Sequence, residues 1–204
     1  MKKVLSLLFL LGVTAHADVV HVALTPPVNP HQARVAGHVL TTRLKAWYLG
    51  APVQPQVDVQ GSAVKVDMPS KPAVPPHAIL TSPGRVSYRI NRGSHDQPRW
   101  VVLVQQPLGT PWFRSGRYLG MNRITLQLNP VGAKVLSKAS KQALHHEMGL
   151  FVDSTLVEAE PVVKVVDTRS PLQLTCSRTM KEADARVLAS LLVGGPLPVK
   201  AKEQ

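Results

Sequence analysis

Apolar residues recur at three- and four-residue spacing in two segments that begin in the same way. Asn29-Pro30 and Asn129-Pro130 each have the character of a helix start, with asparagine as the N-cap and proline in the first helical position. A glycine follows each apolar stripe, at Gly50 and at Gly149. We therefore predict two amphipathic helices, over residues 30–48 and 130–147.

A short segment with strand character precedes each predicted helix, and two more follow it. The strands are expected at residues 19–24, 57–59 and 64–68 in the first unit, and at residues 124–128, 150–152 and 156–157 in the second. Gly61-Ser62 and Asp153-Ser154 are typical of the tight turns that join two strands into a hairpin. Because the order strand, helix, hairpin occurs twice, the sequence predicts an α+β fold with two ferredoxin-like β-α-β-β halves.

A small hairpin lobe is predicted between the two halves. Residues 85–90 and 100–105 have strand character and flank a polar tip. The stretch before them is rich in proline, with Pro69, Pro72, Pro75 and Pro76, and should be extended and irregular because proline lacks an amide donor.

The last part of the chain predicts one strand and one helix. Residues 172–176 alternate between apolar and polar. Thr179 with Glu182 is typical of a capping box, and Gly194-Gly195-Pro196 is expected to stop the helix that it begins. Residues 199–204 are expected to fray.

The first residues predict an export signal. Lys2 and Lys3 precede an apolar run over residues 4–13, and Ala15-His16-Ala17 is a small-x-small cleavage site. The run is too short to span a bilayer, and no later stretch reaches the length of a spanning helix. We expect cleavage before Asp18 and a periplasmic or extracellular protein without a transmembrane segment.

The predicted organisation therefore has four parts. These are a signal peptide over residues 1–17, an N-terminal ferredoxin-like half over 18–84, an inserted hairpin lobe over 85–120, and a C-terminal half over 121–198.

The charge balance favours a polyanion as one possible partner. The chain has 24 Lys and Arg against 12 acidic residues, a formal net charge of +12. Lys134, Lys138 and Lys141 recur at helical spacing opposite an apolar stripe, which is typical of a solvated helix face. The single cysteine, Cys176, allows no intramolecular disulfide.

Enzyme and cofactor chemistry find little support. Adjacent histidines in His145-His146-Glu147 would point in different directions on a helix, so we predict no metal site. No glycine-rich phosphate or dinucleotide motif occurs, and no cofactor is predicted. Cys176 fits a half-buried strand, and Glu158 with Glu160 fits a solvated strand face, so the sequence predicts a protein that is not an enzyme.

One cluster of arginine and aromatic residues supports a binding hypothesis. It consists of Arg92, Arg99, Trp100, Trp112, Phe113, Arg114, Arg117 and Tyr118. Arginine pairs with carboxylate or phosphate, and aromatic faces hold flat or apolar groups, so such a surface would suit a peptide, a glycan or a nucleic acid strand. In the alternative, Trp100 and Trp112 fill the core of the small lobe and the arginines point outward.

A series of motifs resembles the first periplasmic domain of the SecD/SecDF protein-export family. In order, they are residues 124–134 with Asn129 and Gly132-Ala133-Lys134, Leu150 to Asp153, Ala159 to Val162, Thr179 to Ala183, and Leu191 to Pro198. Residues 43–50, 57–61, 64–69 and 79–90 resemble the earlier half of that domain more weakly. Ser154 departs from the glycine of the family's hairpin, residues 72–76 interrupt a region richer in helix formers, and no membrane helices follow Pro198.

The resemblance implies a stand-alone version of a domain that holds emerging polypeptide. We therefore expect a non-catalytic exported module that binds extended polypeptide or contacts the export machinery. The alternatives are a basic envelope protein that binds polysaccharide, lipid headgroups or nucleic acid, and an exported hydrolase.

Overall fold

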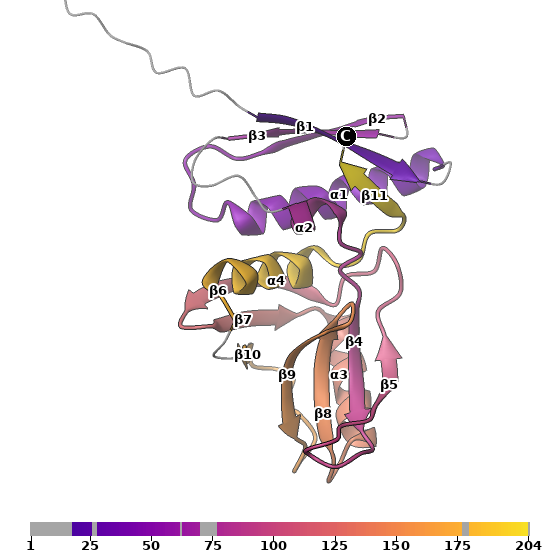
Figure 1. Cartoon of the computed structure of the whole chain (residues 1–204), viewed down its shortest axis with the longest axis vertical. Helices are drawn as coiled ribbons and strands as arrows, with labels where there is room; N and C mark the ends of the chain where they lie inside the picture. Colours follow the sequence, from indigo (N-terminus) through magenta and orange to yellow (C-terminus); the bar gives the residue numbers. More distant parts are fainter. Residues whose placement is uncertain (1–17, 26–27, 62, 70–76, 177–179, 204) are drawn as a thin grey trace, which may run out of the picture.

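The computed structural model describes residues 18–25, 28–61, 63–69, 77–176 and 180–203. Within these residues the chain forms 11 strands and 4 helices, and the strands make three antiparallel sheets (Figure 1). The predicted α+β class is confirmed. The predicted signal peptide, the proline-rich residues 70–76 and Thr179 lie outside the described residues.

The first sheet is built around the first helix. Its strands are β1 (Asp18–Thr25), β2 (Gln56–Gln60), β3 (Ala63–Met68) and β11 (Lys200–Glu203), in the order β11-β1-β3-β2, and the helix is α1 (Pro30–Trp47). The first predicted unit therefore forms one sheet, which a strand from the far end of the chain completes. Residues 200–203 pair with β1, so the prediction that this segment frays is wrong.

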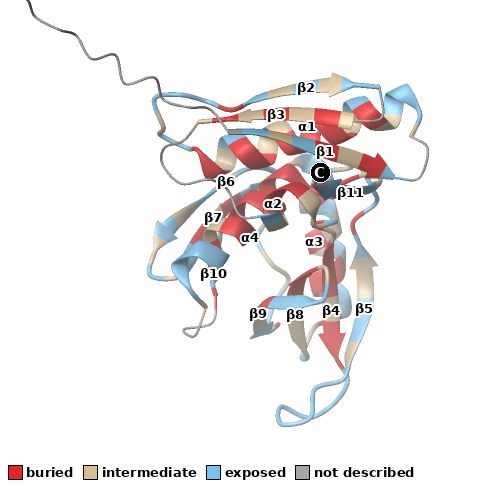
Figure 2. Ribbon diagram, turned by 45° about the horizontal axis from the view of Figure 1, so that its top comes forward, coloured by how far each residue is buried: buried red, intermediate tan, exposed pale blue. Residues whose placement is uncertain are grey.

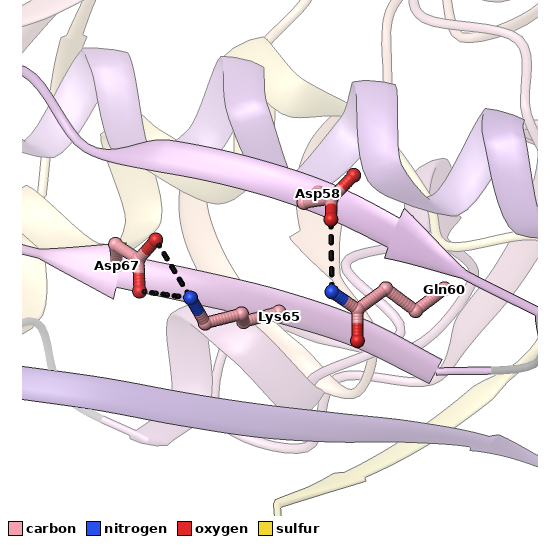
Figure 3. A network of polar contacts seen from close by, with 4 residues as sticks. All are labelled: Asp58, Gln60, Lys65 and Asp67. Carbon is pink, nitrogen blue, oxygen red and sulfur yellow. Dashed lines mark hydrogen bonds and ion pairs between the residues drawn. The ribbon is translucent and has the colours of Figure 1, made fainter.

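The two faces of this sheet differ because side chains alternate along a strand. Val64, Val66 and Met68 of β3 are fully buried. On the other face of β3, Lys65 forms an ion pair with Asp67 at 3.2 Å (Figure 3). Polar neighbours on a strand's outward positions are thus paired with one another, and the apolar positions face the core.

The other two sheets contain the rest of the strands. One has the order β10-β7-β6, with β6 (Phe113–Gly120), β7 (Arg123–Leu128) and β10 (Leu172–Thr175). The other has the order β5-β4-β8-β9, with β4 (Val86–Asn91), β5 (Trp100–Gln105), β8 (Glu147–Val152) and β9 (Thr155–Pro161). The remaining helices are α2 (His77–Thr81), α3 (Pro130–Gln142) and α4 (Glu182–Gly194).

The ferredoxin-like duplication is not confirmed. The second unit has its strand, helix and hairpin, but β7 pairs with β6 and β10, whereas β8 pairs with β4. Its strands are therefore divided between two sheets, because β4 and β6 compete successfully for them. The predicted 85–90/100–105 hairpin is present as β4 and β5, and the proposed boundaries at residues 84 and 120 stay a prediction.

Two helix ends differ from the predicted ones. Helix α3 ends at Gln142, not near residue 147, because His145 donates its amide to Val162 O at 2.8 Å and so leaves the helical ladder. His145 has a φ of +65°, and Glu147 already belongs to β8. Helix α4 has Lys181 as its N-cap, without a side-chain capping bond, so the expected box of Thr179 with Glu182 does not start it.

One hydrophobic core joins the three layers. Helix α4 lies between α1 and β6, and nearly all its residues from 187 onward are buried (Figures 1 and 2). A helix that is apolar on all sides is expected where it is enclosed by other elements. No described helix is long and apolar enough to cross a membrane.

Candidate functional site

The structure divides the predicted arginine and aromatic cluster into two groups. Arg92, Arg99 and Trp100 lie on the hairpin of β4 and β5, and Arg114, Arg117 and Tyr118 lie on β6 in another sheet. Trp112 and Phe113, at the start of β6, belong to neither surface because they are buried.

Trp112 and Phe113 fill the core. They are 1% and 2% exposed. The Trp112 ring stacks on Tyr88, with 5.6 Å between ring centroids and 2° between planes. In this conformation neither side chain can meet a ligand at the surface, so the alternative interpretation from the sequence describes these two residues.

The β6 group is exposed and loosely held. Arg114 donates to the side-chain oxygen of Gln127 at 3.1 Å. Arg117 is exposed and Tyr118 is half-buried. The Tyr118 hydroxyl accepts a long hydrogen bond from the Asn122 amide at 3.4 Å. These side chains stay candidates for ligand contact.

The hairpin group is organised by a buried asparagine. The Asn91 side-chain oxygen accepts from the amides of Gly93 and Arg99, both at 2.9 Å. Its amide group donates to Glu147 at 2.8 Å, which closes the hairpin and anchors it to β8. Arg99 is exposed at this closed end, and Trp100, half-buried, packs edge-to-face on Phe151 at 5.3 Å.

The other residues considered for chemistry do not form a site. Arg92 lies 3.3 Å from His146 Nε2 on the exposed surface, and no group of three His, Cys, Asp or Glu within the described residues could hold a metal ion. Cys176 is buried, and burial raises the pKa of its thiol, as does the charge of Glu158. A thiol with a raised pKa is a poor nucleophile at neutral pH.

A fully buried arginine that we did not predict lies where the chain passes between the first sheet and the other two. Arg43 of α1 is 0% exposed. Its Nη1 donates to the carbonyl oxygens of Ile79 and Ser82, at 3.1 and 2.8 Å. Its Nη2 donates to those of Pro83 and Gly195, at 2.9 and 2.7 Å. One guanidinium thus joins the ends of α2 and α4 to α1.

Two glycines make room for this guanidinium. A Cβ on Gly84 would lie 2.2 Å from Arg43 Nη2, and one on Gly194 would lie 2.2 Å from Arg43 Cγ. Burial lowers the pKa of Arg43 to about 9, and the charge of Asp153 raises it, so the side chain is charged at neutral pH.

Asp153, in the β8–β9 turn, binds the same crossing segment. Its carboxylate accepts from the amides of Gly84 and Arg85, at 3.1 and 2.9 Å. Its backbone oxygen accepts from Arg89 at 2.8 Å. The crossing segment is therefore held by a buried cation on one side and a carboxylate on the other.

Two open cavities flank this junction. The larger, of about 960 Å³, is lined by residues that include Thr81, Pro83, Arg85, Leu108 and Pro198. The second, of about 500 Å³, is lined by residues that include Val152, Asp153, Met180, Leu188 and Leu191. The second is mainly apolar and runs along α4. Both could hold a segment of extended chain, and neither gathers the titratable groups of a catalytic centre.

Known proteins resemble this chain in fold and not in sequence. Neither a family model nor a curated protein matches it. The structure of "a membrane component SecDF that enhances protein export" superposes with a TM-score of 0.61 at 14% identity, over 91% of this chain and 97% of that chain.

A second SecDF structure, in a "Super-membrane-facing form", superposes with a TM-score of 0.63 at 14% identity. That match covers 91% of this chain and 29% of the other, so the chain spans less than a third of that protein. The resemblance to SecD is thereby confirmed at the level of the fold.

Proposed function

We propose that this protein is a non-catalytic module of protein export that holds extended polypeptide outside the cytoplasm. The observation that carries the proposal is the SecDF-like fold, which extends over 97% of one solved SecDF chain. SecDF is described as a membrane component that enhances protein export. The amino-terminal export signal predicted from the sequence is consistent with the proposed location.

The apolar cavity along α4 supports this function. An unfolded chain exposes apolar side chains at intervals, and a mainly apolar groove binds them by removing them from water. Leu188 and Leu191 line the groove, and Asp184 lies at its rim. Because Arg43 and Asp153 fix the segments on both sides, the groove is preorganised.

A specific observation favours polyanion binding as a second candidate function. Lys134, Lys138 and Lys141 are exposed on α3 and line a shallow cavity of about 430 Å³. Within the described residues, the ion pair of Lys65 with Asp67 is the only salt bridge between side chains. These lysines are therefore available to phosphate, sulfate or carboxylate groups.

A salt titration separates the two functions. We would measure binding of a neutral, apolar, blocked ten-residue peptide and of a short DNA duplex by fluorescence anisotropy, at 50 and at 200 mM salt. Peptide binding should change less than about twofold, because it releases few ions. Polyanion binding should weaken by about 10³-fold or more if several phosphates are neutralised.

The matched variant replaces Lys134, Lys138 and Lys141 with glutamine. It should leave the peptide affinity unchanged and weaken DNA binding. If the protein binds the duplex and not the peptide, the export proposal is wrong and the polyanion function takes its place.

A further inference from the structure

The two edges of the sheet β5-β4-β8-β9 are built very differently. Within the described residues, β5 has one hydrogen-bonded neighbour, β4, and β9 has one, β8. A strand at the edge of a sheet presents unpaired amide and carbonyl groups, to which another extended chain can add. Proteins usually protect such edges with charges, proline or a covering segment.

The β9 edge carries these protections. Its sequence includes Glu158 and Glu160 and ends at Pro161. The Thr175 amide, next to β10, donates to the Glu158 carboxylate at 2.7 Å, so a neighbouring segment also approaches this edge. Addition of another strand at β9 would bury carboxylates, which is unfavourable.

The β5 edge carries none of them. Its sequence, from Trp100 to Gln105, contains no charged residue and no proline. Val101 and Val102 are 42% and 50% exposed. The register shifts between Tyr88 and Arg89, so that successive valines are exposed where strict alternation would bury one (Figure 2).

An aromatic and cationic surface adjoins this edge. Val102 lies opposite Arg89 in the register, and the Arg89 guanidinium lies 4.1 Å from the centre of the Phe151 ring. Trp100 packs on the same ring, over Gly149, where a Cβ would come within 3.0 Å of the indole. Since paired residues on neighbouring strands share a face, Val102 belongs to this surface.

We propose that the β5 edge binds an extended apolar segment of another polypeptide, which adds to the sheet as a fifth strand beside β5. Main-chain hydrogen bonds would supply affinity for many sequences, and alternate side chains would lie near Val102 and Trp100. This inference rests on the proposed polypeptide-binding function and assigns it a site. Arg99, at the start of the edge, would favour a neutral or acidic segment. Pairing with a second copy is disfavoured, since each copy has a formal net charge of +12.

The first test separates backbone recognition from apolar adhesion. The probe is the neutral ten-residue peptide, compared with a twin in which alternate amides are N-methylated. The twin keeps its side chains but cannot form the ladder, so its Kd should rise at least about tenfold. Amide hydrogen exchange should show new protection in residues 100–105 when the unmodified peptide binds.

The second test compares the two edges by substitution. Val101→Lys should raise the Kd for the peptide about tenfold, because a lysine on an edge strand blocks addition of another strand. Leu156→Lys on β9 is the matched control, since Leu156 is 40% exposed, and should change the Kd less than about twofold. Val101→Thr keeps the strand geometry and serves if the lysine variant does not fold. It should weaken the peptide measurably and leave the pattern of exchange protection intact.

The outcomes are distinguishable. If the wild-type protein binds no peptide, the proposed function itself fails. If it binds the peptide and its N-methylated twin equally, or if the two lysine variants behave alike, the function stands and the β5 site is wrong. A dimer in sedimentation experiments that Val101→Lys dissociates would also overturn the proposal, because a second copy would then occupy the edge.

Discussion

The two units that begin with Asn-Pro illustrate how one local pattern leads to two tertiary results. In both, an asparagine side chain accepts from the third residue of the helix, Gln32 at 2.8 Å and Gly132 at 2.9 Å. In both, a strand precedes the helix and a hairpin follows it. The first unit closes into one sheet with β11, whereas the second is divided between two sheets.

The difference begins at equivalent helix positions. Counted from the N-cap, Arg43 in α1 corresponds to Ala143 after α3, and both residues are fully buried. Arg43 lies within a helix that continues to Trp47, and it binds four carbonyls of crossing segments. Ala143 is a C-cap, after which the chain turns into β8. The helix starts are therefore set locally, and the partners of each unit are set by long-range contacts.

The largest expected effect comes from removing the guanidinium. Arg43→Met keeps much of the side-chain volume and leaves the carbonyls of Ile79, Ser82, Pro83 and Gly195 without their donor. We expect a loss of about 3–5 kcal/mol in the free energy of unfolding, measured by urea denaturation. Arg34→Met, on the exposed side of α1, is the control and should change stability by less than about 0.5 kcal/mol. Equal effects of the two substitutions would show that Arg43 does not hold the junction.

The two N-caps offer a finer comparison. Asn29 takes part in a capping box with Gln32, whereas Asn129 also donates to Pro111 O at 2.7 Å. Asn29→Asp keeps the acceptor and adds a charge favourable to the helix dipole, so its stability should be unchanged or slightly higher. Asn129→Asp loses the donor and places a carboxylate against a carbonyl, and should lose about 1 kcal/mol.

Urea denaturation of both aspartate variants, with Asn29→Ala and Asn129→Ala beside them, measures this contrast. Each alanine variant should lose about 1 kcal/mol or more through its cap. The comparison fails if the two aspartate variants change stability in the same direction.

Elements that depend on local pattern could be predicted from the sequence. The hairpins of β2 with β3 and of β4 with β5 lie where alternation and turn residues indicate. Strand β6 was missed because its sequence, from Phe113 to Gly120, contains register shifts that break the alternation. Strand β11 was missed because four residues rich in lysine and glutamate become a strand only by pairing with β1.

The candidate site was harder to predict for the same reason. Adjacency in the sequence grouped Trp112 and Phe113 with Arg114, but the sheet buries the first two and exposes the third. Arg43 did carry a signal, because it follows Leu40 by three residues and precedes Trp47 by four, which places it on the apolar stripe of α1. The carbonyls that receive its hydrogen bonds come from segments far along the chain, so their convergence could not be predicted.

The smallest expected effect concerns Glu158, which lines a cavity of about 170 Å³ with Tyr88 between α3, β9 and β10. Burial raises the pKa of this carboxyl, the hydrogen bond from the Thr175 amide lowers it, and the charge of Glu160 raises it, with burial the largest cause. The folded protein therefore binds this proton more tightly than the unfolded chain does. The stability that results is complete below the unfolded pKa and is lost as the pH rises through the folded pKa.

Glu158→Gln removes the titration and keeps an oxygen for the Thr175 amide. Relative to the wild type, its melting temperature should rise as the pH increases from acid to neutral. Glu160→Gln leaves Glu158 titrating with a weaker upward shift of its pKa, so it should reduce this pH dependence without abolishing it. Melting curves of the three proteins between pH 4 and pH 7 measure the effect. A difference between Glu158→Gln and the wild type that is constant with pH would show that the carboxyl is solvated like one on an open strand face, and that the second unit encloses less than its contacts indicate.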